Sequence, residues 1–248
     1  MEFFVSKSNL AVNEEFEDII EEEIIPNEKI NQNIGSEQKS NIIYIILKKI
    51  VDVLSGIFGT ILLIPITIIV CVIRICLHEN DGPLFFEQIR IGKNGKQFRM
   101  YKFRTMVMEA DEKLEKYLEE NPEAKREYKK YKKLKKDPRI TKLGNILRKT
   151  SLDEFPQFIN VLKGEMSLVG PRPYLYREKE DLGEYYYNLI TKVKPGITGY
   201  WQVNGRNDVD FEERAYMDTY YIERRGMVMD LKIVIKTFFK IFKKEGAI

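Results

Sequence analysis

The sequence contains few of the residues that build most metal centres and nucleophile–base pairs. Its 248 residues include one histidine, His78, and two cysteines, Cys71 and Cys76. Both cysteines lie in or just after the most apolar stretch, which argues against a disulfide framework and against a zinc site. The single histidine argues against a histidine-based metal site and against a Ser-His-Asp triad. Any metal ion that the chain uses is therefore expected to be a hard ion with oxygen ligands.

Only one long apolar run is present. Residues 53–73 carry no charge between Asp52 and Arg74, and about 20 apolar residues suffice to span a bilayer. Pro65 removes a backbone hydrogen bond in the middle of the run, and basic residues flank both ends instead of one. We therefore favour a re-entrant helix broken at Pro65 over a spanning helix, with residues 41–50 in the membrane interface. A buried helix of a soluble core is a weaker interpretation, because the run is apolar on every side.

Charge is unevenly distributed along the chain. Residues 1–40 contain ten acidic residues and three lysines, about −7, so residues 41–248 carry about +10 when the formal net charge is +3. The acidic segment lacks a clean apolar period and predicts a poorly ordered extension, without the basic start and apolar core of a signal peptide. The basic remainder predicts an anionic partner, such as nucleic acid, anionic lipid or a phosphorylated substrate.

The segment after the apolar run predicts mostly helices and few strands. Short apolar runs around Lys93-Asn94-Gly95 predict a β-hairpin, because Asn-Gly favours its turn. Residues 109–137 predict two amphipathic helices interrupted at Asn121-Pro122. Three more helices are predicted, a short one over residues 141–149, one between Pro156 and Gly164, and a basic amphipathic one over residues 231–244.

The stretch TSLDEFPQF, residues 150–158, places two carboxylates side by side, Asp153 and Glu154. One interpretation is a helix cap, in which Thr150 or Ser151 and the acids stabilise the positive end of the helix dipole. The other interpretation is a pair of acids held for chemistry. The nine residues leave both interpretations open.

Two later segments have the composition of anion-binding loops. In Gly170-Pro171-Arg172-Pro173, two prolines fix the backbone around one arginine, which suits a bidentate grip on phosphate or an ordinary exposed turn. Residues 194–208 are loop-like and combine three glycines with Trp201 and Arg206. That composition suits backbone contacts to phosphate and stacking on a base.

Five motifs follow one another from about Lys48 to the C-terminus: KKIVDVLSG, DGPLFFEQIRIGKNGKQFRMYKFRTM, DPRITKLGNILRKTSLDEFPQFINVLKGEMSLVGPRP, KPGITGYWQVNGR and DTYYIERRGMVMDLKIVIKTF. In this order they resemble the bacterial sugar transferase family, the monotopic polyprenyl-phosphate phosphoglycosyl transferases. Residues 1–40 lie outside the resemblance.

The resemblance implies a catalytic role for the two acids, because the family's Asp-Glu dyad matches Asp153 and Glu154. In the family, the Asp attacks the β-phosphate of a UDP-sugar, which releases UMP and leaves a covalent phospho-sugar on the enzyme. The lipid phosphate then accepts the phospho-sugar. The Glu helps to hold Mg²⁺ on the diphosphate, so Glu154 is the expected metal ligand.

The resemblance also implies a set of phosphate-binding residues: Lys102, Arg104, Arg148, Arg172 and Arg206. Of these, Arg206 looks like the uridine side of the site. The family's membrane helix is re-entrant and broken at a Ser-Pro or similar pair, which is Ile64-Pro65 here. The charged insert at residues 109–137 looks like that of members acting on UDP-galactose or UDP-glucose.

Together these features predict a mostly helical α/β fold in three parts: an extension over residues 1–40, an interfacial and re-entrant membrane helix over residues 41–76, and a cytoplasmic catalytic domain over residues 77–248. The resemblance implies a phosphotransferase at the bacterial inner membrane, with its catalytic domain on the cytoplasmic face. Its reaction would be the first membrane step of exopolysaccharide, O-antigen or capsule synthesis. Expected partners are a UDP-sugar, undecaprenyl phosphate and anionic membrane lipid, and the oligomeric state stays open, a homodimer included.

Four alternatives remain. The same reaction can use a UDP-N-acetyl-amino sugar. The chain can also be a non-catalytic membrane-bound scaffold for polysaccharide export, or a metal-assisted phosphodiesterase that directs the same acids at water. A membrane-tethered nucleic-acid binder is disfavoured, since no recognised nucleic-acid motif is present.

Overall fold

The apolar run folds as one helix, α3 (Ile42–Cys76), in a computed structural model that describes residues 42–131, 134–205 and 209–243. Residues 43–248 form one structural unit. The predicted extension over residues 1–40 lies outside the described residues.

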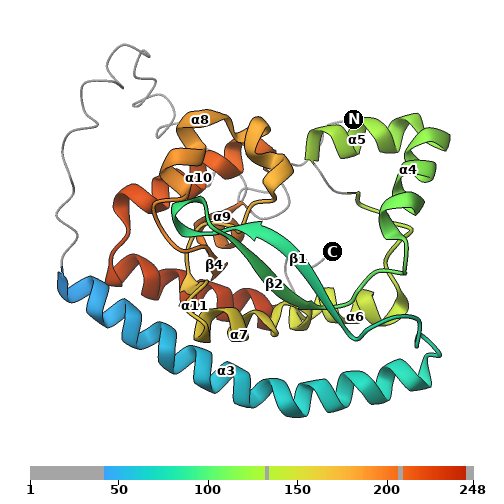
Figure 1. Ribbon diagram of the computed structural model, residues 1–248, viewed down its shortest axis with the longest axis horizontal. Helices are drawn as coiled ribbons and strands as arrows, with labels where there is room; N and C mark the ends of the chain where they lie inside the picture. The colour runs from blue at the N-terminus through green and yellow to red at the C-terminus, as the bar shows by residue number, and fades with distance from the viewer. Residues whose placement is uncertain (1–41, 132–133, 206–208, 244–248) are drawn as a thin grey trace, which may run out of the picture. The chain divides into compact units, whose positions relative to one another are not determined.

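Helix α3 remains helical through Pro65, where the sequence predicts a break. Figure 1 shows that the helix is bowed: it descends from its first turns and rises again toward its end, so both ends turn the same way. A proline inside a helix removes one hydrogen bond and crowds the preceding turn, which accounts for such a bend. Residues 42–50 are the first turns of the same helix and do not form a separate interfacial element.

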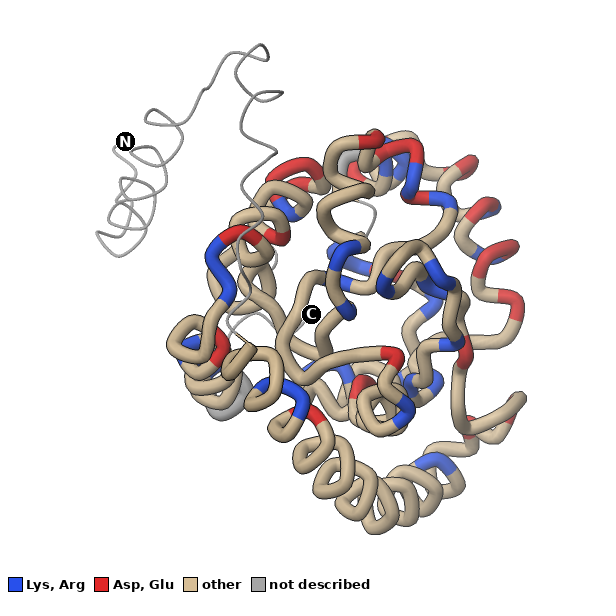
Figure 2. The backbone as a smooth tube through the Cα atoms, turned by 60° about the vertical axis from the view of Figure 1, so that its left-hand side comes forward, with Lys and Arg blue, Asp and Glu red and all other residues tan. Residues whose placement is uncertain are grey.

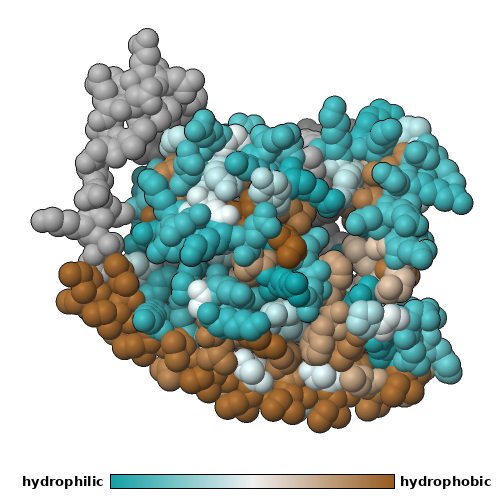
Figure 3. All heavy atoms as spheres, viewed as in Figure 1, coloured by the Kyte–Doolittle hydropathy of each residue, from teal (hydrophilic) through white to brown (hydrophobic). Residues whose placement is uncertain are grey.

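The large apolar side chains of α3 mostly face outward. Only 22% of its most apolar 18-residue segment is buried within the molecule, whereas the core helix of a soluble protein is mostly buried. Figure 3 shows the exposed side chains as an apolar band along the helix, and Figure 2 shows charged residues only toward its two ends. By length and composition, α3 is therefore able to enter or cross a membrane.

The predicted β-hairpin is confirmed. Strand β1 (Phe85–Ile91) pairs with the antiparallel strand β2 (Gln97–Phe103), so that Ile91 lies opposite Gln97. The turn includes the single 3₁₀ turn η1 (Lys93–Gly95), in which Asn94 has a φ of 59°. Asn tolerates this left-handed conformation better than most residues, which is why the Asn-Gly pair predicted the turn.

The helices predicted after the hairpin are also present. The charged stretch folds as α4 (Ala110–Glu120) and α5 (Pro122–Tyr131), on either side of the predicted interruption. Helix α6 (Lys142–Lys149) and helix α7 (Gln157–Leu162) follow.

A second sheet, made of two parallel strands, was missed by the sequence prediction. Strand β3 (Ser167–Val169) pairs with strand β4 (Gly196–Thr198). Segment 194–208, predicted to be loop-like, therefore begins with a strand and continues into the short helix α9 (Tyr200–Asn204). Strands of three residues carry too little alternation to be recognised. Between β3 and β4 lie the turn η3 (Tyr176–Glu178) and helix α8 (Lys179–Ile190).

The C-terminal part consists of α10 (Phe211–Arg224) and α11 (Met227–Lys243), and α11 begins four residues earlier than predicted. These helices pack with α8, α9 and β3 around the largest apolar core, whose buried members are Val169, Tyr174, Leu182, Ile190, Val203, Ala215, Tyr221, Ile222 and Ile233. A polar cluster joins this part to α3, because Asp230 accepts hydrogen bonds from Lys48 (2.7 Å) and Tyr44 (3.1 Å).

Helix α3 also supports the middle of the chain. Leu63 and Val70 of α3 are buried against side chains of β2 and α6. Nearby, Gly59 lies so close to α7 that an added Cβ would be 2.2 Å from the ring of Phe158. The segment α6 to α7 therefore rests directly on α3, as Figure 1 shows.

Candidate active site

The two adjacent acids lie in a single 3₁₀ turn, η2 (Leu152–Glu154), between α6 and α7. Ser151, which precedes the turn, has a φ of 56° and does not cap it through its side chain. The hydroxyl of Thr150 donates back to carbonyls of α6 instead. The predicted side-chain cap by Thr150 or Ser151 is therefore wrong, and the turn places Asp153 in a buried position.

Lys102 of β2 faces both acids. Its Nζ lies 2.6 Å from Oε1 of Glu154 and 3.9 Å from Oδ2 of Asp153. These three groups come from segments 52 residues apart in the chain. The structure thus brings Lys102 to the dyad, as the resemblance implies.

Asp153 is the more perturbed of the two acids. Burial raises the pKa of its carboxyl from 3.8 to about 6, and the negative charge of Glu154 acts in the same direction. The positive charges of Lys102 and Arg148 lower the pKa and so limit the rise. The carboxylate is still the main form at neutral pH, and it is more basic than an exposed aspartate. A buried but ionised carboxylate has the properties of a nucleophile that becomes active when a substrate excludes water.

Two sets of contacts hold the dyad turn in place. On one side, the fully buried Asn160 of α7 accepts a hydrogen bond from the Tyr101 backbone N–H and donates to the Arg99 carbonyl, both in β2. On the other side, Arg148 of α6 donates from Nε to the Thr105 hydroxyl at 3.0 Å. Burial lowers the pKa of Arg148, and the charge of Asp153 opposes this effect, so the positive charge of Arg148 acts on the dyad.

Arg172 is held by the body of the protein, as its two flanking prolines suggest. Its backbone N–H donates to Oδ2 of the buried Asp218 (3.1 Å), which also accepts from the Tyr174 hydroxyl (2.9 Å). Its guanidinium donates to Glu178 at 3.2 Å and lies over the Tyr174 ring at 5.4 Å. The exposed-turn interpretation is therefore wrong, because the side chain is largely covered.

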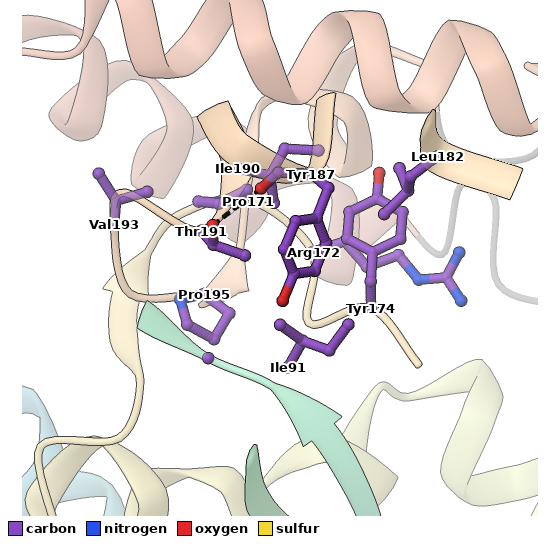
Figure 4. A pocket seen from close by; sticks show the side chains of 11 residues that line it. Ile91, Pro171, Arg172, Tyr174, Leu182, Tyr187, Ile190, Thr191, Val193 and Pro195 are labelled. Atoms are coloured by element: carbon purple, nitrogen blue, oxygen red, sulfur yellow. Dashed lines mark hydrogen bonds between the residues drawn. The ribbon is translucent and has the colours of Figure 1, made fainter. Parts of the chain in front are cut away.

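A small cavity lies behind the Arg172 loop, and Figure 4 shows the side chains that line it. Its volume of about 10 Å³ leaves room for a single water molecule at most. In Figure 4 the Arg172 guanidinium extends away from the apolar side chains such as Ile190 and Val193. The cavity is therefore a packing gap, and Arg172 presents its charge elsewhere.

Arg90 of β1 is a candidate site residue that the sequence analysis did not identify. It donates to the Pro173 carbonyl (2.9 Å) and to Gln88 (2.6 Å), while its buried Nε has no hydrogen-bond partner among the described residues. Burial lowers the pKa of Arg90 to about 9, the charge of Arg172 adds to this, and the charges of Glu178 and Glu154 oppose it. Arg90 is therefore within electrostatic range of Glu154 and of the Arg172 loop. The sequence gives no signal for this role, since Arg90 looks like any cation on a surface strand.

The remaining expected site residues lie elsewhere or outside the described part. Arg104 donates to the Pro83 carbonyl (2.9 Å) and lies over the Phe86 ring, so its contacts are with β1 and the turn before it. Its phosphate-binding role stays a prediction. Arg206 lies outside the described residues. Pro65 lies inside α3 and has no part in the dyad.

The glycines of the predicted nucleotide loop have a packing explanation. A Cβ at Gly196 would lie 2.1 Å from the Gly170 backbone nitrogen, and one at Gly199 would lie 2.3 Å from the Gly170 carbonyl. The ring of Trp201 is covered on one side by Arg214, at 5.6 Å. Two of the three glycines are thus needed for close approach of backbones, whatever else the segment binds.

The dyad supplies two adjacent carboxylates as oxygen donors for a metal ion shared with a substrate. Among the residues that the structure describes, no group of three or more His, Cys, Asp or Glu side chains is arranged to hold a metal ion. Mg²⁺, however, commonly binds through one or two carboxylates and the phosphates of a substrate. The ammonium of Lys102 beside Glu154 shows that a cation is stabilised at this carboxylate. The oxygen donors present therefore fit a Mg²⁺ ion shared with a diphosphate.

Comparisons with known proteins identify the family of this chain. Residues 43–244 match the family model described as bacterial sugar transferase. The undecaprenyl-phosphate galactose phosphotransferase of Salmonella typhimurium strain LT2 is 43% identical over 204 residues, which cover 81% of this chain and 41% of that relative. The UDP-glucose:undecaprenyl-phosphate glucose-1-phosphate transferase of Escherichia coli K12 is 39% identical over 210 residues, 82% of this chain and 41% of that relative.

A third relative is similar to the chain over most of both lengths. The exopolysaccharide production protein ExoY of Sinorhizobium fredii strain NGR234 is 40% identical over 202 residues, which cover 82% of this chain and 88% of that protein. The chain thus spans about two fifths of the length of the first two relatives and most of the length of the third.

Proposed function

Because the chain belongs to the bacterial sugar transferase family, we propose that it transfers a hexose 1-phosphate from a UDP-sugar to undecaprenyl phosphate and releases UMP. The observation that carries this proposal is the buried Asp153 carboxylate, held beside Glu154 and faced by Lys102. The names of the relatives favour UDP-galactose or UDP-glucose as the donor.

The proposed first half-reaction is a displacement at the β-phosphorus of the donor. An oxygen of Asp153 forms a bond to this phosphorus, and the bond from phosphorus to the bridging oxygen breaks. UMP leaves with the electron pair of that bond, and the sugar phosphate stays on the enzyme as an acyl phosphate. Because Asp153 is ionised at neutral pH, the step needs no general base.

The second half-reaction returns the enzyme to its starting state. A phosphate oxygen of the lipid acceptor attacks the same phosphorus, and the bond between phosphorus and Asp153 breaks. The products are a lipid diphospho-sugar and the free carboxylate. Dividing the transfer into two displacements lets the soluble donor and the lipid acceptor react with one carboxylate in turn.

Cations around the dyad would stabilise the phosphates in both steps. Lys102 lies at the dyad, and the charge of Arg148 acts on Asp153. Arg90 is within electrostatic range of both Glu154 and Arg172. Glu154 would hold Mg²⁺ together with the diphosphate, and the ion would supply charge neutralisation there. Lys102 would then turn from Glu154 toward a phosphate oxygen.

We also propose a location for the protein. Helix α3 would enter the cytoplasmic membrane of a bacterium, with the catalytic domain on the cytoplasmic face, where a UDP-sugar is available. Its bow and its apolar exposed band support a re-entrant path. Since α6 and α7 rest on α3, the dyad would lie close to the head-group plane, where the phosphate of a lipid acceptor is found.

The first experiment measures UMP release by full-length protein in nanodiscs, with Mg²⁺ and a panel of UDP-sugars that includes N-acetyl-amino sugars. Without acceptor, wild type should release about one UMP per enzyme and keep sugar-labelled phosphate on the protein. Addition of undecaprenyl phosphate should move that label to lipid and allow turnover. Asp153→Asn should abolish UMP release and labelling of the protein. Asp111→Asn, at an exposed position of α4, should leave both unchanged.

Other results would favour the alternatives. UMP release from an N-acetyl-amino donor alone would keep the reaction and change the sugar. Release of free sugar phosphate without acceptor would favour a phosphodiesterase. No UMP from any donor would favour a scaffold for polysaccharide export.

A further inference from the structure

A second hollow lies far along the chain from the dyad, at the junction of α9, α10 and α11. It is an open groove of about 460 Å³, a volume in the range of small-molecule sites. Its inner wall contains the buried side chains of Val203 and Ile233. The residues that line it are Tyr200, Val203, Asn204, Tyr220, Arg224, Gly226, Met227, Val228, Met229, Lys232, Ile233 and Lys236.

The groove combines this apolar wall with a cationic rim. Arg224, Lys232 and Lys236 are among its lining residues, and none of the described residues that line it is acidic. The Arg224 guanidinium lies 4.3 Å from the centre of the Tyr220 ring, which packs against Tyr200 at 4.9 Å. A pocket with three cations and no acid is complementary to an anion, and the tyrosines add rings suited to a polar–apolar boundary.

The groove is continuous with an exposed apolar stripe. Val228 belongs to the groove lining, and Leu231, Ile235 and Phe238 follow it at helical spacing on α11. These four side chains are between 47% and 68% exposed, which is unusual for a folded domain in water. Lys232 and Lys236 run beside the stripe, the pattern of a helix that lies in a membrane interface.

The position of α11 places the groove next to the membrane helix. Asp230, in the first turn of α11, bonds to Tyr44 and Lys48 of α3. Lys48 precedes the uncharged part of α3, so it marks the level at which that helix meets the head groups. The groove residues Met229 and Lys232 flank Asp230 closely in sequence and are therefore held near the same level.

We propose that this groove binds an anionic glycerophospholipid, with the phosphate on Arg224, Lys232 and Lys236 and the start of an acyl chain on the apolar wall. The occupant is a resident membrane lipid and is not consumed, because none of the groove residues belongs to the dyad or its cations. The site is independent of the proposed transfer reaction and would persist if the chain catalysed a different one. It anchors the C-terminal half of the domain at a second point, formed by α9, α10 and α11.

The test uses the full-length protein purified in detergent and measures retained lipid by native mass spectrometry with phosphatidylglycerol or phosphatidylcholine. Wild type should retain phosphatidylglycerol at least about tenfold better than phosphatidylcholine, because three cations attract its anionic head group. The variant Arg224→Gln/Lys232→Gln/Lys236→Gln should lose this preference. The matched control Lys113→Gln/Lys116→Gln/Lys125→Gln, which removes the same charge from exposed positions of α4 and α5, should keep it.

A second variant separates the groove from general charge attraction. Val228→Trp should fill the groove without removing a cation, and it should abolish phosphatidylglycerol retention while binding of the protein to vesicles stays the same or increases. UMP release, measured in the same samples, should be unchanged in both groove variants, which shows that they fold. Equal retention by wild type and the groove variants would overturn the proposal. So would equal loss in the control variant, or retention of undecaprenyl phosphate alone.

Discussion

Asp153 shows how one side chain can be both buried and reactive. Its burial raises the pKa, and two neighbouring cations keep the rise to about 6. Because the reactive form is the carboxylate, the rate of acceptor-independent UMP release should rise with pH through about 6 and level off above it. Lys102→Met removes one of the charges that lower the pKa, so the ascending limb should move to higher pH.

Single-turnover measurements between pH 5 and 8 check this prediction. They avoid the acceptor, whose own phosphate titrates in this range. Lys96→Met, at an exposed position of the hairpin turn, is the control and should leave the profile unchanged. A profile that does not move in Lys102→Met would mean that this lysine does not act on the charge of Asp153.

Arg90 is a cation whose buried Nε has no hydrogen-bond partner among the described residues. The charges of Glu178 and Glu154 only partly offset the effect of burial on its pKa. An anionic substrate would compensate this charge, so Arg90→Met should raise KM for the donor about tenfold or more, the loss expected for a charged hydrogen bond. Arg99→Met, on the exposed face of β2, should leave KM unchanged.

Donor titrations of wild type, Arg90→Met and Arg90→Lys check this second prediction. Arg90→Lys should recover part of the affinity because it keeps the charge. If Arg90→Met lowers the melting temperature but leaves KM unchanged, the residue only holds the Pro173 backbone in place.

Among the secondary-structure elements, α3 is longer than a helix needs to be to cross a membrane once. A straight helix of 35 residues is about 50 Å long, whereas the hydrocarbon core of a bilayer is about 30 Å thick. Exposed apolar side chains nevertheless occur along α3 from Ile42 to Ile75. A bowed helix that lies partly along the interface accommodates this pattern better than a straight spanning helix.

Cysteine labelling in sealed inverted membrane vesicles checks this third prediction. In a Cys71→Ser background, Cys76 and an introduced Lys49→Cys mark the two ends of α3. A re-entrant helix predicts that a membrane-impermeant maleimide labels both positions from the cytoplasmic side. Glu115→Cys on α4 defines that side. Labelling of only one end would instead establish a spanning helix.

For the chain as a whole, packing on α3 connects the dyad with the surfaces proposed to face a membrane. The second half of α3 packs on β2 and α6, and α7 approaches it at Gly59. The first half joins α11 through Lys48 and Asp230. Helix α3 therefore supports both the dyad and the proposed lipid groove. A net charge of about +10 after residue 40 suits an anionic membrane surface.

Much of this arrangement follows from local sequence. Turn chemistry at Asn94 determines the hairpin, and helical periodicity determines α4, α5, α6 and α11, because these signals act between near neighbours. The adjacent acids Asp153 and Glu154 could be recognised from motifs. The apolar run could be recognised because membrane entry depends mainly on length and composition.

The remaining features depend on contacts between distant segments. Strands β3 and β4 are too short to show a pattern and form only because their backbones meet at Gly170 and Gly196. The pairing of Lys102 with Glu154, the direction of Arg104 and the position of Arg90 are likewise set by packing. A charged side chain looks the same in any sequence, and only its three-dimensional neighbours decide whether its charge is paired, buried or presented to a substrate.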